Sequence, residues 1–415
     1  MRDGSDLGAR VTDLLLRYLA SAPDRAEPVV RFAAPAELEA AFRASGADLP
    51  LGPAQSPLSD DALLAAVETT LRYSVRTQHP RFFNQNFAGA DPVAVLGDWV
   101  AAAAHTTGAT YEMAPVFTLM ERALIARLAE VAGLQPAEGL LNPGGALSNL
   151  YALHLARCCA APASLTQGLH QGPRLLAFAS AHAHYSLDKS VALAGLGREA
   201  LHRVPCDEAG RLRPEALAAA LLRAKRRGEL PFFVCATAGT TVVGAFDPLP
   251  EIAALCAEHD VWLHVDGCHG ASVLFSPRHR HLLRGIESAD SLAWDLHKML
   301  GLTQQCAVLL VRAPGQLRAA FASQAGYLFQ PDKNHAELDL GDLTFQCARR
   351  IDSFKLWLTW KARGDEGFAH RVDHAMALAA HAVALLAVGL DDDLAPAVRA
   401  AADPLAFRVS MRFPG

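Results

Sequence analysis

The sequence predicts an α/β fold in which a mostly parallel central sheet is flanked by helices and preceded by a helical arm. Two observations carry this prediction. Between about residues 91 and 350, short apolar runs typical of buried strands alternate with helical patterns. Before residue 75, helical segments are separated by proline-containing links. We therefore expect an N-terminal helical arm over 1–75, a large α/β domain over 76–355 and a partial small C-terminal domain over 356–415.

The helical arm is expected to pack on a surface other than its own. Its helical segments are joined by links at Ala22-Pro23, Ala34-Pro35, Gly52-Pro53 and Ser56-Pro57. An arm of this kind has no core of its own, and a partner subunit often provides the surface that covers it. We therefore expect the protein to form a homodimer.

Apolar runs and helical periodicity identify the elements of the large domain. The predicted strands are Leu175–Phe178, Phe232–Ala236, Val261–Val265, Ser291–Trp294 and Ala307–Val311, with helices Pro214–Arg226 and Leu249–Glu258 between them. Buried strands that alternate with helices favour a parallel sheet covered on both faces. After residue 355, an amphipathic helix over Phe354–Ala362, an alanine-rich helix and a strand over Ala406–Met411 are predicted.

Composition excludes several classes of protein. Hydrophobic residues make up 51% of the chain and charged residues 20%, so a large core can form and extensive disorder is not expected. The formal net charge is -5, and the nearest approach to a basic cluster, Arg223–Arg227, ends a predicted helix. Basic residues are favourable at a helix C-terminus. We therefore expect no nucleic-acid partner.

Cysteine usage and hydropathy indicate the compartment. The eight cysteines include no CxxC pair, and Cys235 and Cys268 lie in apolar runs, where a thiol usually behaves as a small hydrophobe. No secretory signal is evident at the N-terminus. The most apolar late segment, Ala375–Leu390, is interrupted by His381 and is shorter than the ~20 residues of a membrane span. We expect a cytoplasmic protein without membrane association.

Polar side chains follow the predicted strands at the points where ligands bind in parallel sheets. The carboxyl ends of such strands meet at one edge, which is the usual ligand site. The residues found after the apolar runs are His184, Thr237, Asp266 and Lys298. In addition, Gly144-Gly145 precedes a predicted helix, and a glycine turn there offers backbone N–H groups to an anion.

These groups together predict a site for pyridoxal 5'-phosphate. The cofactor needs a lysine that forms an imine, a carboxylate that keeps the pyridine nitrogen protonated, a ring that stacks on its face and a cradle for its phosphate. Each feature taken singly is common in proteins without a cofactor, as strand caps, surface lysines or turns. Their joint placement at strand ends is what indicates the cofactor.

Long motifs resemble one enzyme family over about two thirds of the chain. The segments His79–Gln85, Thr110–Phe117, Asn142–Asn149, Ala236–Thr241, Gly244–Pro248, Trp262–Asp266, His297–Met299, Ala325–Lys333 and Gln346-Cys347 carry the resemblance. The chain resembles the pyridoxal-dependent decarboxylases of glutamate, cysteine sulfinate and related acidic amino acids. The resemblance implies a fold-type I enzyme that removes the α-carboxylate of an acidic amino acid as CO₂ and leaves the amine.

The resemblance also implies roles for residues near the cofactor. Lys298 would be the Schiff-base lysine, and Asp266 would be the partner of the pyridinium nitrogen. His184 would stack on the cofactor ring and assist proton movements, while Thr237 would lie near the phenolic oxygen. The turn Gly145-Ala146-Leu147 would hold the phosphate, and His297 would bind phosphate or shape the site.

Other roles implied by the resemblance concern the substrate. Tyr327, in the mobile-loop motif, would protonate the carbanionic intermediate, and its reference pKa near 10 keeps it protonated at neutral pH. Gln85 lies in the segment that meets the substrate carboxylate. Thr107 and Ala109 would line the substrate site, where glutamate decarboxylases carry an Asn and a Phe. The family dimer implies an active site near the subunit interface.

Departures from the family pattern shape further expectations. The usual Asn-Pro-His-Lys is Asp295-Leu-His297-Lys298, and we expect the Asp295 side chain not to contact the phosphate because adjacent anions repel. The usual Asp-Ala-Ala-Trp-Gly is Asp266-Gly-Cys-His-Gly270. With Thr107 and Ala109 in the pocket, we expect cysteine sulfinate or aspartate to be preferred to glutamate. No arginine for the substrate carboxylate can be assigned.

Three alternatives differ in class. One is a different pyridoxal enzyme, such as an aldolase or aminotransferase. Another is a catalytically impaired family member that acts as a dimer scaffold. The third is a zinc hydrolase, because His264–His269 packs four potential ligands into six residues, but no HExxH or CxxC accompanies them and no metal is expected.

Overall fold

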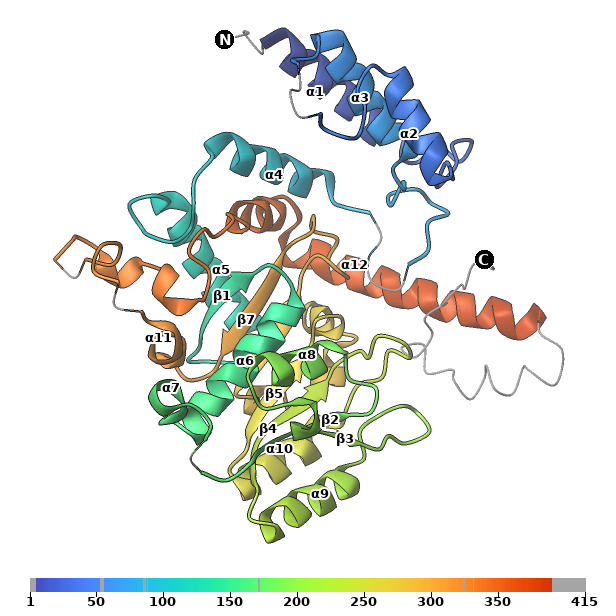
Figure 1. The fold of residues 1–415 in the computed structure, drawn as a ribbon. Coiled ribbons are helices and arrows are strands. Elements are labelled where there is room, and N and C mark those ends of the chain that lie inside the picture. The colour runs from blue at the N-terminus through green and yellow to red at the C-terminus, as the bar shows by residue number, and fades with distance from the viewer. Residues whose placement is uncertain are drawn as a thin grey trace. The chain divides into compact units, whose positions relative to one another are not determined.

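The computed structural model describes residues 5–52, 56–84, 87, 89–170, 172–323, 325–330 and 332–389 (Figure 1). The chain forms two compact units. One comprises Met1–Asn84 with Ala88–Pro92, and the other comprises Gln85–Phe87 with Val93–Gly415. The predicted strand Ala406–Met411 lies outside the described residues, and the predicted domain boundaries at 75 and 355 stay predictions.

The first unit is helical. It contains α1 (Ser5–Ala20), α2 (Pro35–Ala44) and α3 (Asp60–Tyr73). The Ser59 hydroxyl caps α3 by accepting a hydrogen bond from the backbone N–H of Ala62, which satisfies one of the free N–H groups at a helix start. Neither α2 nor α3 has a buried residue within the described structure, so these helices form no closed apolar core.

The second unit contains a seven-stranded sheet in the order β1-β7-β6-β5-β4-β2-β3. All neighbouring strands from β6 to β3 are parallel, and β7 runs antiparallel to both of its neighbours. This confirms the predicted mostly parallel sheet. The strands are β1 (Glu138–Asn142), β2 (Leu175–Ser180), β3 (Leu201–Val204), β4 (Leu230–Thr237), β5 (Trp262–Asp266), β6 (Ser291–Asp295) and β7 (Ala307–Val311).

All of the predicted strands in the large domain are present, and β1 and β3 were not predicted. Strand β3 is an edge strand whose sequence, Leu-His-Arg-Val, exposes His202 and buries its two ends. A half-exposed edge strand lacks the continuous apolar run that marks the central strands. Strand β1 is short and includes Gly139, which has no side chain and whose backbone packs against Leu309. The sequence of β1 therefore lacks the long apolar run that marks a buried strand.

Helices cover both faces of the sheet, and each face has its own apolar cluster (Figure 1). Along β7, Val308 and Leu310 join the cluster made with α5, α9, α10 and α12, while Leu309 and Val311 join the one made with α6 and α8. The helices are α4 (Pro92–Ala104), α5 (Pro115–Ala132), α6 (Gly145–Ala160), α7 (Ser164–Gln167), α8 (Ser186–Leu193), α9 (Pro214–Arg226), α10 (Leu249–His259), α11 (Gln316–Phe321) and α12 (Ser353–Gly389), with 3₁₀ turns at Arg198–Ala200, Gly270–Phe275, Arg280–Leu283, Ile286–Ser288, Ala336–Leu338 and Gly341–Leu343.

The strand register places polar residues side by side at one edge of the sheet. Thr237, the last residue of β4, pairs with Asp266, the last residue of β5. Asp266 in turn lies opposite Ala293 of β6, two residues before Asp295. Because these strands are parallel, their ends converge at the carboxyl edge. The fold therefore gathers the polar strand ends that the sequence predicts.

Candidate active site

One pocket at the carboxyl edge of the sheet collects half of the predicted site residues. It is lined by the ends of β4, β5 and β6, the loop after β2 and the start of α6. Of the residues proposed from the sequence, Lys298, Asp266, His184, Thr237, Gly145 and Ala146 line it, together with Asn149, Gly239, Thr241, Cys268, His269 and Asp295. The pocket lining therefore includes a lysine, two carboxylates, two imidazoles, two hydroxyls and a helix N-terminus.

Asp266 is a buried carboxylate held by hydrogen bonds. Its Oδ2 accepts a bond of 2.9 Å from Asn149 Nδ2, and its Oδ1 accepts one of 3.2 Å from the backbone N–H of Cys268. Burial favours the neutral acid, but hydrogen bonding to Cys268 and the nearby Lys298 outweigh it and hold the pKa of Asp266 below its usual value. Asp266 is therefore ionised at neutral pH.

A chain of buried side chains fixes the position of Asn149. The Oδ1 atom of Asn149 lies 2.9 Å from Nε2 of His264, and the other ring nitrogen lies 2.9 Å from the Ser291 hydroxyl. Burial lowers the pKa of His264 to about 4, so its ring is neutral and Nε2 donates to Asn149. This leaves the Asn149 amide free to donate to Asp266.

Sequence reasoning did not assign roles to Asn149 or His264 in the site. Asn149 lies in a helix and His264 lies within a strand, whereas the predicted site residues follow strand ends. The signal that could have found them is a polar side chain within an otherwise apolar stretch of a predicted strand or helix. A buried polar group needs a hydrogen-bond partner, and Asn149 and His264 are partners of each other.

Lys298 pairs with Asp295 inside the pocket. The Lys298 Nζ atom lies 3.1 Å from Oδ2 of Asp295, and the carboxylate is almost completely buried. Burial by itself would lower the pKa of Lys298, but the carboxylates of Asp295 and Asp266 raise it above its ordinary value. Burial also raises the pKa of the Cys268 thiol well above its usual range, so that thiol stays neutral. Lys298 is a paired ammonium group.

The start of α6 approaches the pocket closely enough to exclude a side chain. A Cβ atom on Gly145 would overlap Sγ of Cys268 and lie 3.1 Å from each carboxylate oxygen of Asp295. The first N–H groups of a helix have no partner within the helix and attract anions. The N–H of Leu147 donates to the carbonyl of Gly144 and its side chain lines a separate apolar groove, and its predicted role in holding the phosphate stays a prediction.

His184 and Thr237 present polar groups to the pocket. Nδ1 of His184 lies 2.9 Å from the Ser186 hydroxyl, and its ring packs beside Tyr185 with 4.2 Å between centroids. Burial, aided by Lys298, lowers the pKa of His184, so the ring is neutral at neutral pH. The Thr237 backbone N–H donates to Asp247, while its buried hydroxyl makes no hydrogen bond to the described residues. That hydroxyl is available to a ligand.

The family model described as the pyridoxal-dependent decarboxylase conserved domain matches residues 45–399. The chain belongs to this decarboxylase family. It is accordingly a pyridoxal-phosphate-dependent amino-acid carboxy-lyase of fold type I. This confirms the resemblance and favours a decarboxylase over the aldolase and aminotransferase alternatives.

Solved structures of decarboxylases share the fold. Mouse CSAD, a cysteine sulfinic acid decarboxylase, is 39% identical, with 94% of this chain and 80% of that chain covered and a TM-score of 0.88. Its apo form is 40% identical, with 94% and 81% covered and a TM-score of 0.87. The TDC of Oryza sativa, solved with PLP and tryptamine, is 26% identical, with 93% and 79% covered and a TM-score of 0.83.

The residues of the pocket fit the cofactor of this decarboxylase family. Gly145 adds no side chain at the helix N-terminus, where a phosphate can bind, and the buried hydroxyl of Thr237 lacks a partner that a ligand oxygen could provide. Asp266 is held as an anion at the bottom of the pocket, which suits a protonated ring nitrogen. Lys298 supplies the amine.

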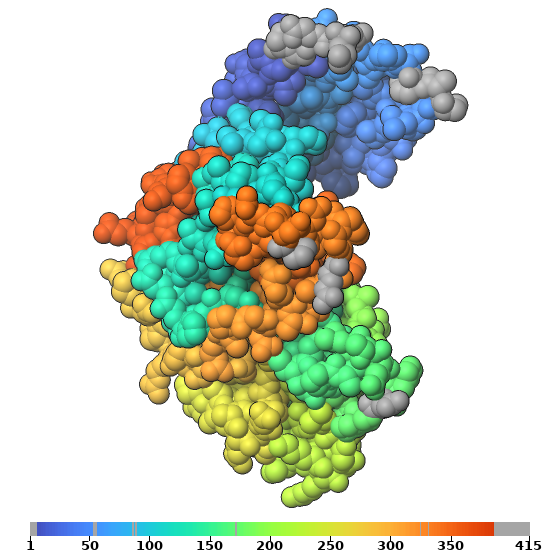
Figure 2. All heavy atoms as spheres, turned by 90° about the vertical axis from the view of Figure 1, so that its left-hand side faces the viewer, coloured from blue at the N-terminus to red at the C-terminus, as the bar shows by residue number. Residues whose placement is uncertain are grey.

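Some predicted residues lie elsewhere in this decarboxylase. His297 is buried behind the pocket, where Nδ1 lies 2.9 Å from the carbonyl of Cys306 and Nε2 lies 3.8 Å from Asp295. Tyr327 is 87% exposed in the surface segment after α11, drawn in orange in Figure 2, and lines the same apolar groove as Leu147. Gln85 lies outside the described residues. The role predicted for each stays a prediction.

Thr107 and Ala109 contact the segment that follows Tyr327 rather than Lys298. The Thr107 hydroxyl accepts a bond of 3.1 Å from the backbone N–H of Arg349, and the buried Ala109 accepts one of 2.8 Å from Gly341 through its carbonyl. Two stretches far apart in the sequence are thus side by side on the face shown in Figure 2. Neither residue lines the pocket that contains Lys298.

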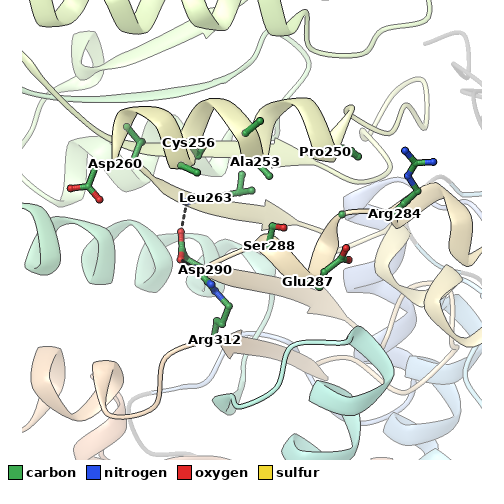
Figure 3. A pocket seen from close by; sticks show the side chains of 14 residues that line it. Pro250, Ala253, Cys256, Asp260, Leu263, Arg284, Glu287, Ser288, Asp290 and Arg312 are labelled. Atoms are coloured by element: carbon green, nitrogen blue, oxygen red, sulfur yellow. Dashed lines mark hydrogen bonds and ion pairs between the residues drawn. The ribbon is translucent and has the colours of Figure 1, made fainter.

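A wider pocket of about 640 Å³ lies at the opposite edge of the sheet (Figure 3). Asp290, just before β6, accepts a hydrogen bond of 2.8 Å from the Leu263 backbone and pairs with Arg312. None of the residues proposed for catalysis or cofactor binding lines it. It lies at the amino ends of the parallel strands, away from the edge where such sheets bind ligands.

Metal ligation and membrane insertion find no support in the described part of the chain. The residues that the structure describes include no group of three or more His, Cys, Asp or Glu side chains that could hold a metal ion. His264, considered above as a zinc ligand, uses both ring nitrogens for Asn149 and Ser291. Of the described helices, none combines the length and the apolar character needed to cross a bilayer.

Proposed function

We propose that this enzyme removes the α-carboxylate of an acidic amino acid, with cysteine sulfinate or aspartate preferred to glutamate. The observation that supports this most directly is the 39% identity to mouse cysteine sulfinic acid decarboxylase over nearly the whole described fold. The departures at Thr107 and Ala109 from the Asn and Phe of glutamate decarboxylases support the same preference. The loss of a polar contact can change selectivity far more than a methylene difference does.

We assign the residues of the pocket as follows. Pyridoxal phosphate, when bound, supplies an electron sink for the bond that breaks at Cα. Asp266, ionised and fixed by Asn149, would hold a proton on the ring nitrogen. Lys298 would hold the cofactor through its Nζ atom, and the N-terminus of α6 at Gly145 and Ala146 would bind the phosphate.

His184 and Thr237 would orient the ring. The neutral imidazole of His184 is fixed by Ser186 and lies at the wall of the pocket, where it could pack on the ring face and relay protons. The free hydroxyl of Thr237 would donate to the phenolic oxygen. His297, held by the carbonyl of Cys306, would act indirectly by limiting how far Asp295 can move.

Tyr327 would deliver a proton to Cα from a second copy of the chain. Its side chain is 87% exposed and does not line the pocket in its own chain. The exposed Phe32 and Leu51 and the coreless helices of the first unit also favour a homodimer with its active site near the interface. All eight cysteines are free thiols, which supports a cytoplasmic location.

The experiment that tests the function is a product assay on the purified protein. The cofactor spectrum is recorded first, and CO₂ and amine are then measured with cysteine sulfinate, aspartate, glutamate and aromatic amino acids. We expect a protein-bound cofactor and CO₂ release from the acidic substrates. A bound cofactor without CO₂ from any amino acid would support the scaffold alternative and contradict the proposal.

Substrate preference is tested by restoring the residues of glutamate decarboxylases. The values of kcat/KM for the three acids are compared between wild type and the Thr107→Asn/Ala109→Phe variant. We expect the ranking to move toward glutamate. Because Ala109 is buried, thermal unfolding must confirm that the variant folds, and Thr107→Asn alone serves as the milder test. A wild type that favours glutamate would disprove the preference.

A further inference from the structure

Asp295 places a second carboxylate beside Asp266 in the pocket. Its side chain is 3% exposed, and Oδ2 lies 3.1 Å from Nζ of Lys298. The other oxygen, Oδ1, is buried and makes no hydrogen bond within the described part of the chain. Thus the Asp295 side chain does not point away from the pocket. Half of its hydrogen-bonding capacity is unused.

The same carboxylate faces the N-terminus of α6. Both of its oxygens lie 3.1 Å from the position that a Cβ atom on Gly145 would take, so the Asp295 side chain and the helix start are neighbours. A helix N-terminus stabilises an anion placed there. In this structure Asp295 is that anion. Under the proposed function, on which this inference rests, the cofactor phosphate needs the same place.

The ion pair between Lys298 and Asp295 also limits the free space in the pocket. The space among the lining side chains is about 70 Å³, enough for only a few water molecules. A ring that carries a phosphate is much larger, so Lys298 and Asp295 must separate when it enters. An ionised Asp295 left beside a phosphate would then face like charge at close range, which costs several kcal/mol.

We propose that Asp295 controls cofactor loading: it holds the unloaded site closed as a carboxylate and remains beside the phosphate only as a neutral acid. The proton comes from the ammonium group of Lys298. One N–H bond breaks and one O–H bond forms, the ion pair becomes an amine and a carboxylic acid, and the total charge is unchanged. The transfer frees the nitrogen lone pair that binds the cofactor and turns Oδ2 of Asp295 from an acceptor into a donor.

The groups around Asp295 leave Lys298 as the proton source. Its titratable neighbours come from the loop after β2, the end of β5 and the turn after it, the segment after β6 and the residue before β7, and they are His184, Asp266, Cys268, His297, Lys298 and Cys306. Asp266 is ionised and has no proton to give. Burial raises the pKa of both thiols and lowers the pKa of His184, which keeps these three neutral. His297 is bonded through Nδ1 to the Cys306 backbone.

The test measures cofactor binding without the covalent bond. The Kd of pyridoxal phosphate is determined by equilibrium dialysis at pH 7, 8 and 9 for Lys298→Ala and for Lys298→Ala/Asp295→Asn. With the local proton source removed, the carboxylate of Asp295 stays beside the phosphate, so the single variant should bind the cofactor weakly. The double variant should bind it at least about tenfold more tightly than Lys298→Ala at each pH.

A matched control uses the same substitution at the other end of β6. Lys298→Ala/Asp290→Asn changes a carboxylate that pairs with Arg312 outside the pocket, and its Kd should follow that of Lys298→Ala. Equal Kd values with and without Asp295, or tighter binding with it, would overturn the inference. Failure of wild type to bind the cofactor at all would instead overturn the proposed function.

A second measurement uses protein in which Lys298 is unchanged. In Asp295→Asn without cofactor, the Lys298 ammonium group loses its partner in a buried site, so Tm should fall below that of wild type. Saturation with pyridoxal phosphate should raise Tm by more in the variant than in wild type. A purely structural role for Asp295 predicts that Tm falls equally in both states, and that result would also contradict the inference.

Discussion

Replacing Gly145 with alanine tests the close approach of α6 to the end of β5. The new Cβ would overlap Sγ of Cys268 and lie well inside the 3.0 Å that real Cβ contacts essentially never fall below. Atoms of this kind normally touch at about 3.5–4.0 Å. Neither partner can move freely, because Gly145 begins a helix and Cys268 is fully buried next to Asp266.

The size of the effect follows from this contact. Overpacking a buried site costs about 1–3 kcal/mol, and the second contact, 3.1 Å to both oxygens of Asp295, places Gly145→Ala near about 3 kcal/mol. Cys268→Ala alone removes one buried atom and should cost about 1 kcal/mol. In the double variant the new methyl group occupies the space that the sulfur leaves. We therefore expect a coupling of about 2 kcal/mol in favour of the pair.

The assay is urea unfolding of the cofactor-free protein, combined with cofactor titration. Gly8→Ala serves as the control, because Gly8 lies in α1 with no atom within 4 Å of its added Cβ and should gain up to about 1 kcal/mol. Gly145→Ala should also weaken cofactor binding, since its methyl group lies in the cradle. A loss below about 1 kcal/mol, or no recovery with Cys268→Ala, would refute the packing described here.

The remaining predictions concern Lys298, Asp266 and His264. Lys298→Ala should abolish the borohydride-trappable lysine adduct, and peptide mapping that places the wild-type label on another lysine would contradict the assignment. Asp266→Asn should weaken cofactor binding and lower kcat by orders of magnitude, because a neutral ring is a poor electron acceptor. His264 has a pKa of about 4 in the folded state and about 6.5 when unfolded, so its stability contribution is present above pH 6.5 and falls by about 3 kcal/mol toward pH 4. His264→Gln should remove this loss, which is measured by denaturant titrations of both proteins between pH 6.5 and pH 4. Burial raises the pKa of Asp247 to about 6, and its opposite effect on stability is present in both proteins, so it cancels when wild type and variant are compared.

The sequence by itself determined the central sheet and the edge that carries the chemistry. The strands that it predicts are buried on both faces, so their apolar runs are continuous and local sequence is sufficient to identify them. Parallel strands then bring their carboxyl ends together, whatever the details of packing. This is why Asp266, Thr237, His184 and Lys298 could be assigned to one site before any coordinates were considered.

Elements without a strong local pattern could not be predicted in this way. The edge strand β3 alternates buried and exposed residues over only a few positions, and β1 is identified by its partner β7 rather than by its own composition.

Tyr327 illustrates the same limit for function. Its motif predicts a catalytic role, but its side chain is exposed and does not line the pocket that contains Lys298.

Only the tertiary structure decided how the site is held and where its charges pair. Asn149 and Asp266 are separated by 117 residues, and their hydrogen bond depends on how α6 packs against the end of β5. The structure places Asp295 beside Lys298 and the start of α6, and the expectation that it avoids the phosphate stays a prediction. Side-chain direction, burial and the nearest opposite charge depend on contacts between distant segments, and no local pattern in the sequence encodes them.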